Sequence, residues 1–280
     1  MAHSTPSPDA HAGQQATQPE KGAGPVIVFD HITKYFPATD GPPLEVLRDV
    51  SFSIPRGEIV AILGRSGAGK STLLNPAAGL IVPDRGSVRI LGRDTREAVD
   101  WRRVGYMFQD DRLLPWRVAW KNVALALETE SMPAAERKQR ALAALELVGL
   151  AAFADSYPHQ LSGGMRSRVA LARSLVGEPD VLLMDEPFSR LDAQTRGTMH
   201  RELLRVQALR QVSILFVTHD VEESVVLAGR IVMLSPRPGR VQRQVDVNFA
   251  QPRVGTPQTV SLTAELRAAL EATHPEEIAS

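Results

Sequence analysis

The stretch GRSGAGKS at residues 64–71 decides the fold. It matches in full the pattern G-x-x-x-x-G-K-S/T, which binds the phosphates of a nucleoside triphosphate. The apolar run 59–63 precedes it and a predicted helix follows, so the loop joins a buried strand to a helix. Glycines let backbone N–H groups close around phosphate oxygens, and the helix N-terminus adds its positive dipole end. Lys70 brings a point charge to the β- and γ-phosphates, and the Ser71 hydroxyl can ligate Mg²⁺.

The residues predicted to hold the phosphates run through this loop into the first turn of the helix. They are Gly64, Arg65, Ser66, Gly67, Ala68, Gly69, Lys70, Ser71 and Thr72. The loop alone predicts a nucleoside triphosphate ligand, and it cannot separate a transporter from a kinase or a GTPase.

Two acidic residues follow a second apolar run. Residues 181–184 lead directly into Asp185 and Glu186. Placing two carboxylates at the end of a buried strand is costly unless they interact with a cation or a reactant. Asp185 stands where a phosphate-loop enzyme needs an acid near Mg²⁺, and Glu186 is placed to polarise the attacking water as a general base. The pair therefore favours hydrolysis of the nucleotide.

Composition excludes several other classes of protein. The 280 residues include 32 basic and 32 acidic side chains, and this balance gives no electrostatic case for binding nucleic acid. The chain has no cysteine, which excludes disulfides and thiolate metal sites. No apolar run reaches the roughly 18 residues needed to span a bilayer, so we expect any membrane role to be peripheral.

The remaining apolar runs predict an α/β fold. Residues 1–24 are rich in Ala, Pro, Ser, Gln and Gly, and we expect a disordered tail there. Strands and helices alternate in the second half, which predicts a parallel sheet. Strands are expected at 26–29, 46–54, 59–63, 181–184, 214–217 and 231–234. Helices are expected at 134–148, 169–176, 194–209 and 263–273.

The run LSGGM at residues 161–165 supports a more specific identification. It resembles LSGGQ, the signature of ABC ATPases, with methionine in the fifth place, and it lies about twenty residues before Asp185. The chain also has the family's order of motifs: phosphate loop, Gln109, signature, acidic pair, Asp192 and His219. From about residue 26 to residue 245, the chain therefore resembles the ABC ATPase family.

The resemblance implies a P-loop NTPase core of ABC ATPase type. An N-terminal antiparallel β subdomain and a helical subdomain carrying the signature complete that fold. The implied boundaries are an ATPase domain at 25–250, with the helical subdomain at about 110–178, and a C-terminal extension at 251–280.

The resemblance also assigns roles to single residues. Phe36 resembles the aromatic residue that stacks on adenine, with Tyr35 as the competing candidate. Gln109 resembles the glutamine that senses Mg²⁺ and the attacking water. Asp192 resembles the aspartate that links the two halves of the dimer, and His219 resembles the histidine that contacts the γ-phosphate. The implied catalytic set is Lys70, Gln109, Glu186 and His219, and the implied metal ligands are Ser71, Gln109 and Asp185.

Ser162, Gly163 and Gly164 precede a helix expected to begin near Met165, and they offer a hydroxyl, N–H groups and a dipole end to a phosphate. In the family this segment serves the nucleotide of the opposite subunit. The resemblance thus implies two ATP molecules, each with Mg²⁺, held between two copies of the chain.

The segment MFQDDRLLPW at 107–116 resembles importer subunits for nitrate, aliphatic sulfonates and taurine, as do Met165-Arg166 and the run 235–240. This branch implies transmembrane permease subunits as partners, a periplasmic or extracellular solute-binding protein as an indirect partner, and a location on the cytoplasmic face of the membrane. Leu113, Leu114 and Trp116 are expected to form the groove for the permease, unless they pack inward.

Alternative functions remain open within the family: an exporter subunit, or a nucleotide-binding regulator impaired in hydrolysis. Members that act in DNA repair or translation fit poorly, because some fifty residues separate Gln109 from the signature and the chain has one ATPase unit. Three departures from the family pattern, Pro76, Ser167 and Arg190, predict altered coupling. Pro76 is expected to kink its helix at a cost of roughly 3 kcal/mol.

Overall fold

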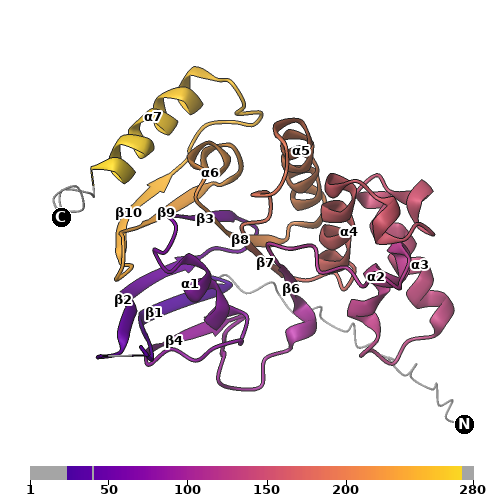
Figure 1. Ribbon diagram of the computed structural model, residues 1–280, viewed down its shortest axis with the longest axis horizontal. Helices are drawn as coiled ribbons and strands as arrows, with labels where there is room; N and C mark the ends of the chain where they lie inside the picture. The colour runs from indigo at the N-terminus through magenta and orange to yellow at the C-terminus, as the bar shows by residue number, and fades with distance from the viewer. Residues whose placement is uncertain (1–23, 40, 273–280) are drawn as a thin grey trace, which may run out of the picture.

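The computed structural model describes residues 24–39 and 41–272. The predicted tail at 1–24 therefore lies outside the described residues except for Gly24. The chain forms two sheets with helices packed between and around them (Figure 1). No described helix is both long enough and apolar enough to cross a membrane.

An antiparallel sheet holds the N-terminal strands in the order β2-β1-β4-β5. Its strands are β1 (Ile27–Phe36), β2 (Leu44–Ile54), β4 (Arg85–Ile90) and β5 (Arg93–Asp94). The strand predicted at 26–29 is longer than the sequence indicates, because polar residues on its exposed face interrupt the apolar run after Phe29.

A larger sheet has the strand order β10-β9-β3-β8-β7-β6, parallel except for β10. Its strands are β3 (Ile59–Leu63), β6 (Val104–Met107), β7 (Val181–Asp185), β8 (Ser213–Thr218), β9 (Arg230–Leu234) and β10 (Val241–Asp246). Every residue of β3 and β8 is buried, which explains why their sequences are almost continuously apolar.

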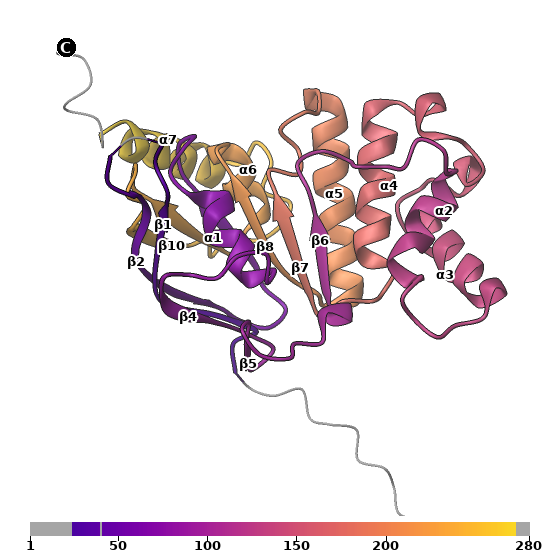
Figure 2. The same ribbon diagram turned by 60° about the horizontal axis from the view of Figure 1, so that its bottom comes forward.

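The helices are α1 (Lys70–Ala77), α2 (Ala119–Ala124), α3 (Ala134–Leu147), α4 (Gly163–Leu175), α5 (Ala193–Arg210), α6 (Val221–Leu227) and α7 (Pro257–Glu271). Helix α1 lies between the two sheets, since Leu73 and Leu74 share one buried cluster with Phe29 and Leu215. Helices α2, α3 and α4 gather to one side of the larger sheet, with α5 between them and the strands (Figure 2).

Two helices begin earlier in the chain than expected. Helix α4 begins at Gly163 rather than near Met165, because the Ser162 hydroxyl caps it. Helix α7 begins at Pro257, six residues before the predicted start, because proline is well suited to the first helical position.

The prediction that Pro76 kinks its helix is wrong, because α1 ends one residue later, at Ala77. The backbone N–H groups of Ala78 and Leu80 donate to the carbonyl of Asn75, and Gly79, between them, has a φ of 68°. Proline therefore stands in the last turn, where an interrupted hydrogen-bond ladder has no further helix to bend.

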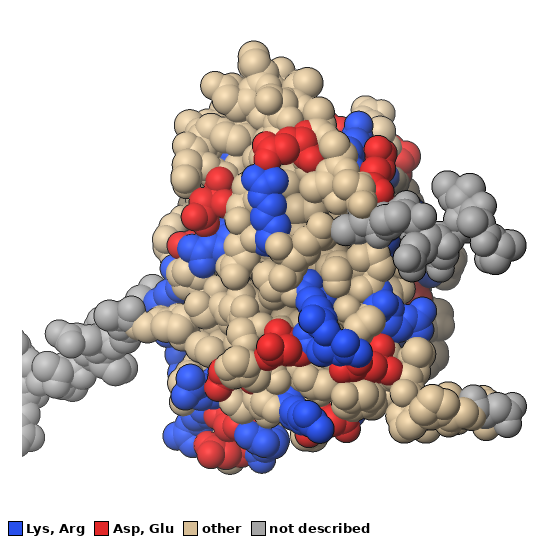
Figure 3. Space-filling model, turned by 90° about the vertical axis from the view of Figure 1, so that its left-hand side faces the viewer, with Lys and Arg blue, Asp and Glu red and all other residues tan. Residues whose placement is uncertain are grey.

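The surface charge agrees with the balanced composition. On the face beside α7 and β2, the described basic and acidic side chains are interspersed rather than gathered by sign (Figure 3). On this face, the described side chains form no basic stripe of the kind that follows a nucleic-acid backbone.

Candidate functional site

The phosphate loop connects the buried end of β3 to the first turn of α1. Gly67 and Gly69 have φ angles of 81° and 89°, a region that favours glycine. A Cβ atom on Gly69 would lie 2.8 Å from Leu47 Cδ2, so β2 covers the loop closely. Lys70 is 5% exposed, and its Nζ donates to the carbonyls of Gly64 and Arg65, each at 3.0 Å. The loop is therefore held in a closed form by its own lysine.

The acidic pair at the end of β7 meets this loop. Ser71 Oγ donates to Asp185 Oδ1 at 2.8 Å. Glu186 Oε1 lies 3.5 Å from Lys70 Nζ, and Glu186 Oε2 lies 3.1 Å from His219 Nδ1. Five of the residues predicted from separate motifs, Lys70, Ser71, Asp185, Glu186 and His219, thus form one connected cluster.

The backbone at Glu186 is unusual. Its φ of 43° is in the left-handed region, which costs a residue with a side chain free energy. Its N–H donates to the Val217 carbonyl at 3.1 Å, two residues before His219. This bond ties the end of β7 to the end of β8 and directs both side chains toward the phosphate loop.

Burial moves two charged groups of this cluster toward their neutral forms. Burial raises the pKa of the Asp185 carboxyl, and the Ser71 hydrogen bond opposes that rise. Burial lowers the pKa of the Lys70 ammonium, and Glu186 opposes that fall. A desolvated carboxylate and a desolvated ammonium next to a glycine-rich loop suit a site that receives a cation and an anion together.

Gln109 reaches the same cluster through Ser189, which the sequence reasoning did not identify. Gln109 Nε2 donates to Ser189 Oγ at 3.4 Å, and Ser189 Oγ donates to the Glu186 carbonyl at 3.0 Å. Arg190, an unusual residue at its position, forms a surface ion pair with Asp110. A serine three residues after a glutamate carries no signal in the sequence that could have revealed this link.

Of the two candidates for stacking on adenine, Phe36 has the freer ring. Its side chain is exposed, and Lys34 Nζ lies 5.6 Å from the ring centroid. The Tyr35 hydroxyl donates to Glu45 at 3.1 Å, and its backbone N–H donates to Asp84. The Phe36 ring is thus exposed while Tyr35 is held by two hydrogen bonds, and the choice of Phe36 as the stacking residue stays a prediction.

The signature segment lies in the helical part of the chain. Ser162 Oγ accepts from the Met165 N–H at 3.2 Å, which leaves the hydroxyl proton for another acceptor. Asp192 caps α5 by accepting from the Thr195 N–H at 3.0 Å, and hydrogen bonding from the Thr195 side chain and from this N–H lowers the pKa of its carboxyl. In the described part of the chain, no hydrogen bond or ion pair joins Ser162, Gly163 or Gly164 to the phosphate loop.

Gly164 packs against the start of α5, and this contact yields a prediction. A Cβ on Gly164 would lie 2.2 Å from Thr195 Cγ2, and overpacking of this kind costs about 1–3 kcal/mol. We expect Gly164→Ala to lower ATP hydrolysis about 10-fold while nucleotide affinity stays within about twofold, because the signature shifts and the phosphate loop does not. Initial-rate kinetics and fluorescent-nucleotide titration measure the two quantities.

Adding Thr195→Ser to Gly164→Ala removes the clashing methyl group and should restore most of the activity. Gly197→Ala is the matched control, since its Cβ would have 3.7 Å to its nearest neighbour, Arg201 Nη1. An equal loss in the single and double variants would show that the Thr195 contact is irrelevant.

The segment after Gln109 is anchored to α4 by residues that the sequence reasoning did not use for this purpose. Arg166 Nε donates to Asp111 Oδ2 at 3.0 Å, and Arg173 donates to the carbonyls of Asp111 and Arg112. Trp116 is 71% exposed, while Leu113 packs partly against the core. Of the apolar residues expected to form a groove, Trp116 is exposed, whereas Leu113 and Leu114 are half-buried.

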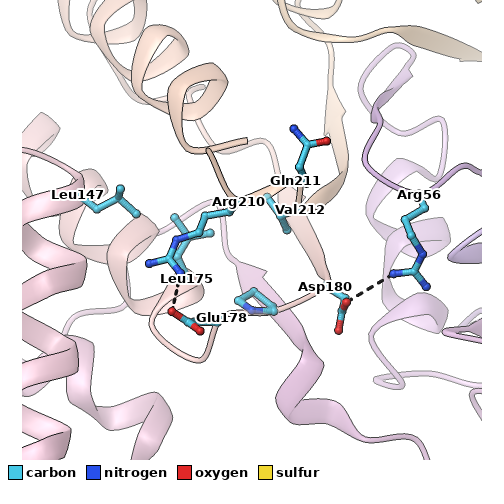
Figure 4. Close-up of a pocket in the computed structure, with 9 residues that line it drawn as sticks. Arg56, Leu147, Leu175, Glu178, Asp180, Arg210, Gln211 and Val212 are labelled. Atoms are coloured by element: carbon cyan, nitrogen blue, oxygen red, sulfur yellow. Dashed lines mark hydrogen bonds and ion pairs between the residues drawn. The ribbon is translucent and has the colours of Figure 1, made fainter. Parts of the chain in front are cut away.

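A separate cavity of about 220 Å³ lies at the opposite ends of β7 and β8 (Figure 4). Two ion pairs, Arg210–Glu178 at 2.5 Å and Arg56–Asp180 at 3.5 Å, flank its apolar floor. Asp185 is the last residue of β7 and His219 directly follows β8, both at the far ends of these strands, so this cavity is distinct from the phosphate-loop cluster.

Comparison with known proteins agrees with this geometry. A family model described as ABC transporter matches residues 47–189. The taurine import ATP-binding protein TauB of Rhizobium johnstonii is 42% identical over 257 residues, which are 89% of this chain and 97% of the relative. The nitrate import ATP-binding protein NrtD of Synechocystis sp. is 45% identical over 204 residues, 72% of this chain and 76% of the relative.

Among solved structures, a dimeric ATP-binding cassette in a post-hydrolysis state, bound to ADP and Pi, superimposes with a TM-score of 0.71. Its sequence identity is 32%, and the match covers 80% of this chain and 100% of that chain. These similarities confirm the predicted fold class and the resemblance drawn from the motifs.

Proposed function

Because this chain belongs to the ABC transporter family of ATP-hydrolysing proteins, we propose that its ATPase activity drives import of a small oxyanion or organosulfur solute. The observation that carries the proposal is the cluster of Lys70, Ser71, Asp185, Glu186 and His219, since it brings together a phosphate-binding lysine, two candidate metal ligands and a candidate general base. The cargo class follows from relatives named for taurine and nitrate import, which resemble most of this chain.

In the proposed mechanism, Lys70 and the loop N–H groups hold the phosphates of ATP. Glu186 accepts a proton from the attacking water, and His219, bonded to Glu186, orients that carboxylate and contacts the γ-phosphate. Gln109, which is linked to the Glu186 carbonyl through Ser189, helps to orient the attacking water.

Mg²⁺ fits the oxygen donors that the chain presents. Ser71, Asp185 and Gln109 would hold it, and all three offer the hard oxygen ligands that Mg²⁺ prefers. Burial raises the pKa of the Asp185 carboxyl because it removes water from the carboxylate, and a bound cation would offset this desolvation. When bound, the ion neutralises charge that develops on the phosphate oxygens.

We further propose that a second copy of the chain completes each site. Ser162 has a free hydroxyl proton at a helix N-terminus, but in the described residues it does not reach the phosphate loop of its own chain. A partner copy could supply this segment to the nucleotide held by Lys70, in agreement with the dimeric solved cassette. Asp192 and Ser189 would lie near the contact between the copies.

The membrane partners are proposed from the segment that follows Gln109. Trp116 exposes an aromatic ring on a segment whose backbone is held by Arg166 and Arg173, and exposed tryptophans are enriched at protein interfaces. We propose transmembrane permease subunits there, with the chain on the cytoplasmic face of the membrane and a solute-binding protein across it.

Uptake by cells tests this proposal. Cells lacking the gene should lose high-affinity uptake of labelled taurine or nitrate, and the wild-type gene should restore it. The gene carrying Glu186→Gln should not restore uptake, whereas Glu222→Gln, at an exposed acid nearby, should. Normal uptake of both solutes in the deletion strain would contradict the proposed cargo class, while purified protein that still hydrolyses ATP would leave the ATPase assignment intact.

A further inference from the structure

A buried histidine and a buried glutamate face each other behind the proposed catalytic residues. His200 in α5 and Glu223 in α6 have side chains that are 11% and 5% exposed. His200 Nε2 and Glu223 Oε1 are 3.6 Å apart, and neither atom has a hydrogen-bond partner. Two unpaired polar atoms in a protein interior are rare and call for an explanation.

His200 contacts the segment that follows Glu186. Its ring meets the ring of Phe188 edge-on, with centroids 4.8 Å apart and an interplanar angle of 73°. Phe188 is 1% exposed and stands two residues after Glu186, just before Ser189. A shift of this segment therefore moves the ring against which His200 rests.

Glu223 contacts the loop that carries His219. Its Oε2 accepts from the Thr218 hydroxyl, and its N–H donates to Asp220 Oδ1 at 3.1 Å. Thr218 and Asp220 are the two neighbours of His219 in the chain. Glu223 is thus bonded to the side chains of both neighbours of His219, to Thr218 through its carboxylate and to Asp220 through its backbone N–H.

Helix α5 makes a second connection one turn earlier. Arg196 donates to the Leu191 carbonyl at 3.1 Å and to Asp220 Oδ2 at 3.0 Å. Arg196 and His200 are four residues apart and lie on one face of the helix. Through both residues, α5 touches the segment after Glu186 and the His219 loop together.

We propose that His200 is a positioning residue that couples the segment after Glu186 to His219, an inference that rests on the proposed roles of these two residues. Movement of His200 toward Glu223 by less than about 1 Å would bring the two unpaired atoms into hydrogen-bond range. The new bond would draw the Thr218–Asp220 loop with it. A partner copy that presses on Ser189 and Asp192 would thereby set the position of the histidine that contacts the γ-phosphate.

The test compares two replacements of His200. His200→Gln keeps a donor that can reach Glu223, whereas His200→Leu keeps bulk without a donor. In the full-length protein, we expect His200→Leu to lower kcat for ATP about 10-fold with KM within about twofold of the wild type. His200→Gln should stay within about threefold in both constants. His31→Leu, at an exposed histidine, is the control.

Glu223→Gln completes a double-mutant cycle. If His200 acts on the His219 loop through its bond to Glu223, His200→Leu should have little further effect on kcat in the Glu223→Gln background. Equal kcat values for His200→Gln and His200→Leu would contradict the proposal. So would additive losses of kcat in the cycle that parallel the losses in melting temperature, since both results would show that His200 acts only by packing. Failure of the proposed site itself would show separately, as near-normal hydrolysis by Glu186→Gln.

Discussion

Glu186→Gln is expected to lower ATP hydrolysis by about 10²–10⁴-fold, the range typical for loss of a general base. The amide keeps the shape of the carboxylate but cannot accept the proton of the attacking water. Lys70 and the phosphate-loop amides are unchanged, so ATP should still bind. The variant should therefore accumulate as an ATP-bound dimer, which size-exclusion chromatography with light scattering would detect.

Glu222→Gln provides the matched control, since Glu222 is exposed on α6 close to the site but makes no contact with Lys70 or His219. Because the membrane partners can favour association, the assembled complex is the stricter test of the trapped dimer. Hydrolysis by Glu186→Gln within threefold of the wild type would assign the base to another residue.

Asp185→Asn is expected to move stability and activity in opposite directions. Burial raises the pKa of the Asp185 carboxyl in the folded protein above its ordinary value of 3.8. The carboxyl therefore favours folding when it is protonated, and this contribution is lost as the pH rises through the folded-state pKa. At pH 7 the ionised group opposes folding of the nucleotide-free protein, and asparagine removes that charge while it still accepts from Ser71.

The melting temperature of nucleotide-free Asp185→Asn should accordingly exceed that of the wild type at pH 7 by a few degrees. The scale is about 2–4 °C per kcal/mol for a chain of this size. The gap should narrow as the pH is lowered toward 3.8. Hydrolysis with Mg²⁺ should fall by about 100-fold or more, since a proposed metal ligand loses its charge.

Differential scanning fluorimetry from pH 7 to pH 5, with and without Mg²⁺ and ATP, separates these effects. Asp246→Asn, at an exposed acid paired with Arg230, is the control for a lost surface charge. A lower melting temperature for Asp185→Asn at pH 7 in the absence of ligand would contradict the role of burial at this position.

The sequence predicted the elements whose side chains are buried on every side. β3, β7 and β8 are nearly unbroken apolar runs, and such runs predict buried strands without further information. β10 alternates irregularly and is mostly exposed at the sheet edge, and no periodic signal revealed it. Pro257 indicated an irregular segment, although the same residue is favoured at the start of a helix.

The candidate site shows a similar division. The motifs located Lys70, Ser71, Asp185, Glu186 and His219 by spacing, and the fold brings them together; their roles remain predictions. Ser189, His200 and Glu223 were not identified, because each matters only through a neighbour far along the chain. Contacts of this kind depend on how α5 and α6 are packed, and residue type alone does not encode them.

The caps at Ser162 and Asp192 have a consequence for assembly. Each of these side chains is already fixed by a backbone N–H of the helix that it begins, although both are proposed to face a second copy. These two side chains therefore lose little rotamer entropy when two copies meet, and the entropic cost of association comes mainly from lost translational and rotational freedom. Subunit exchange should then proceed as rigid docking of preformed surfaces, without a folding transition of its own.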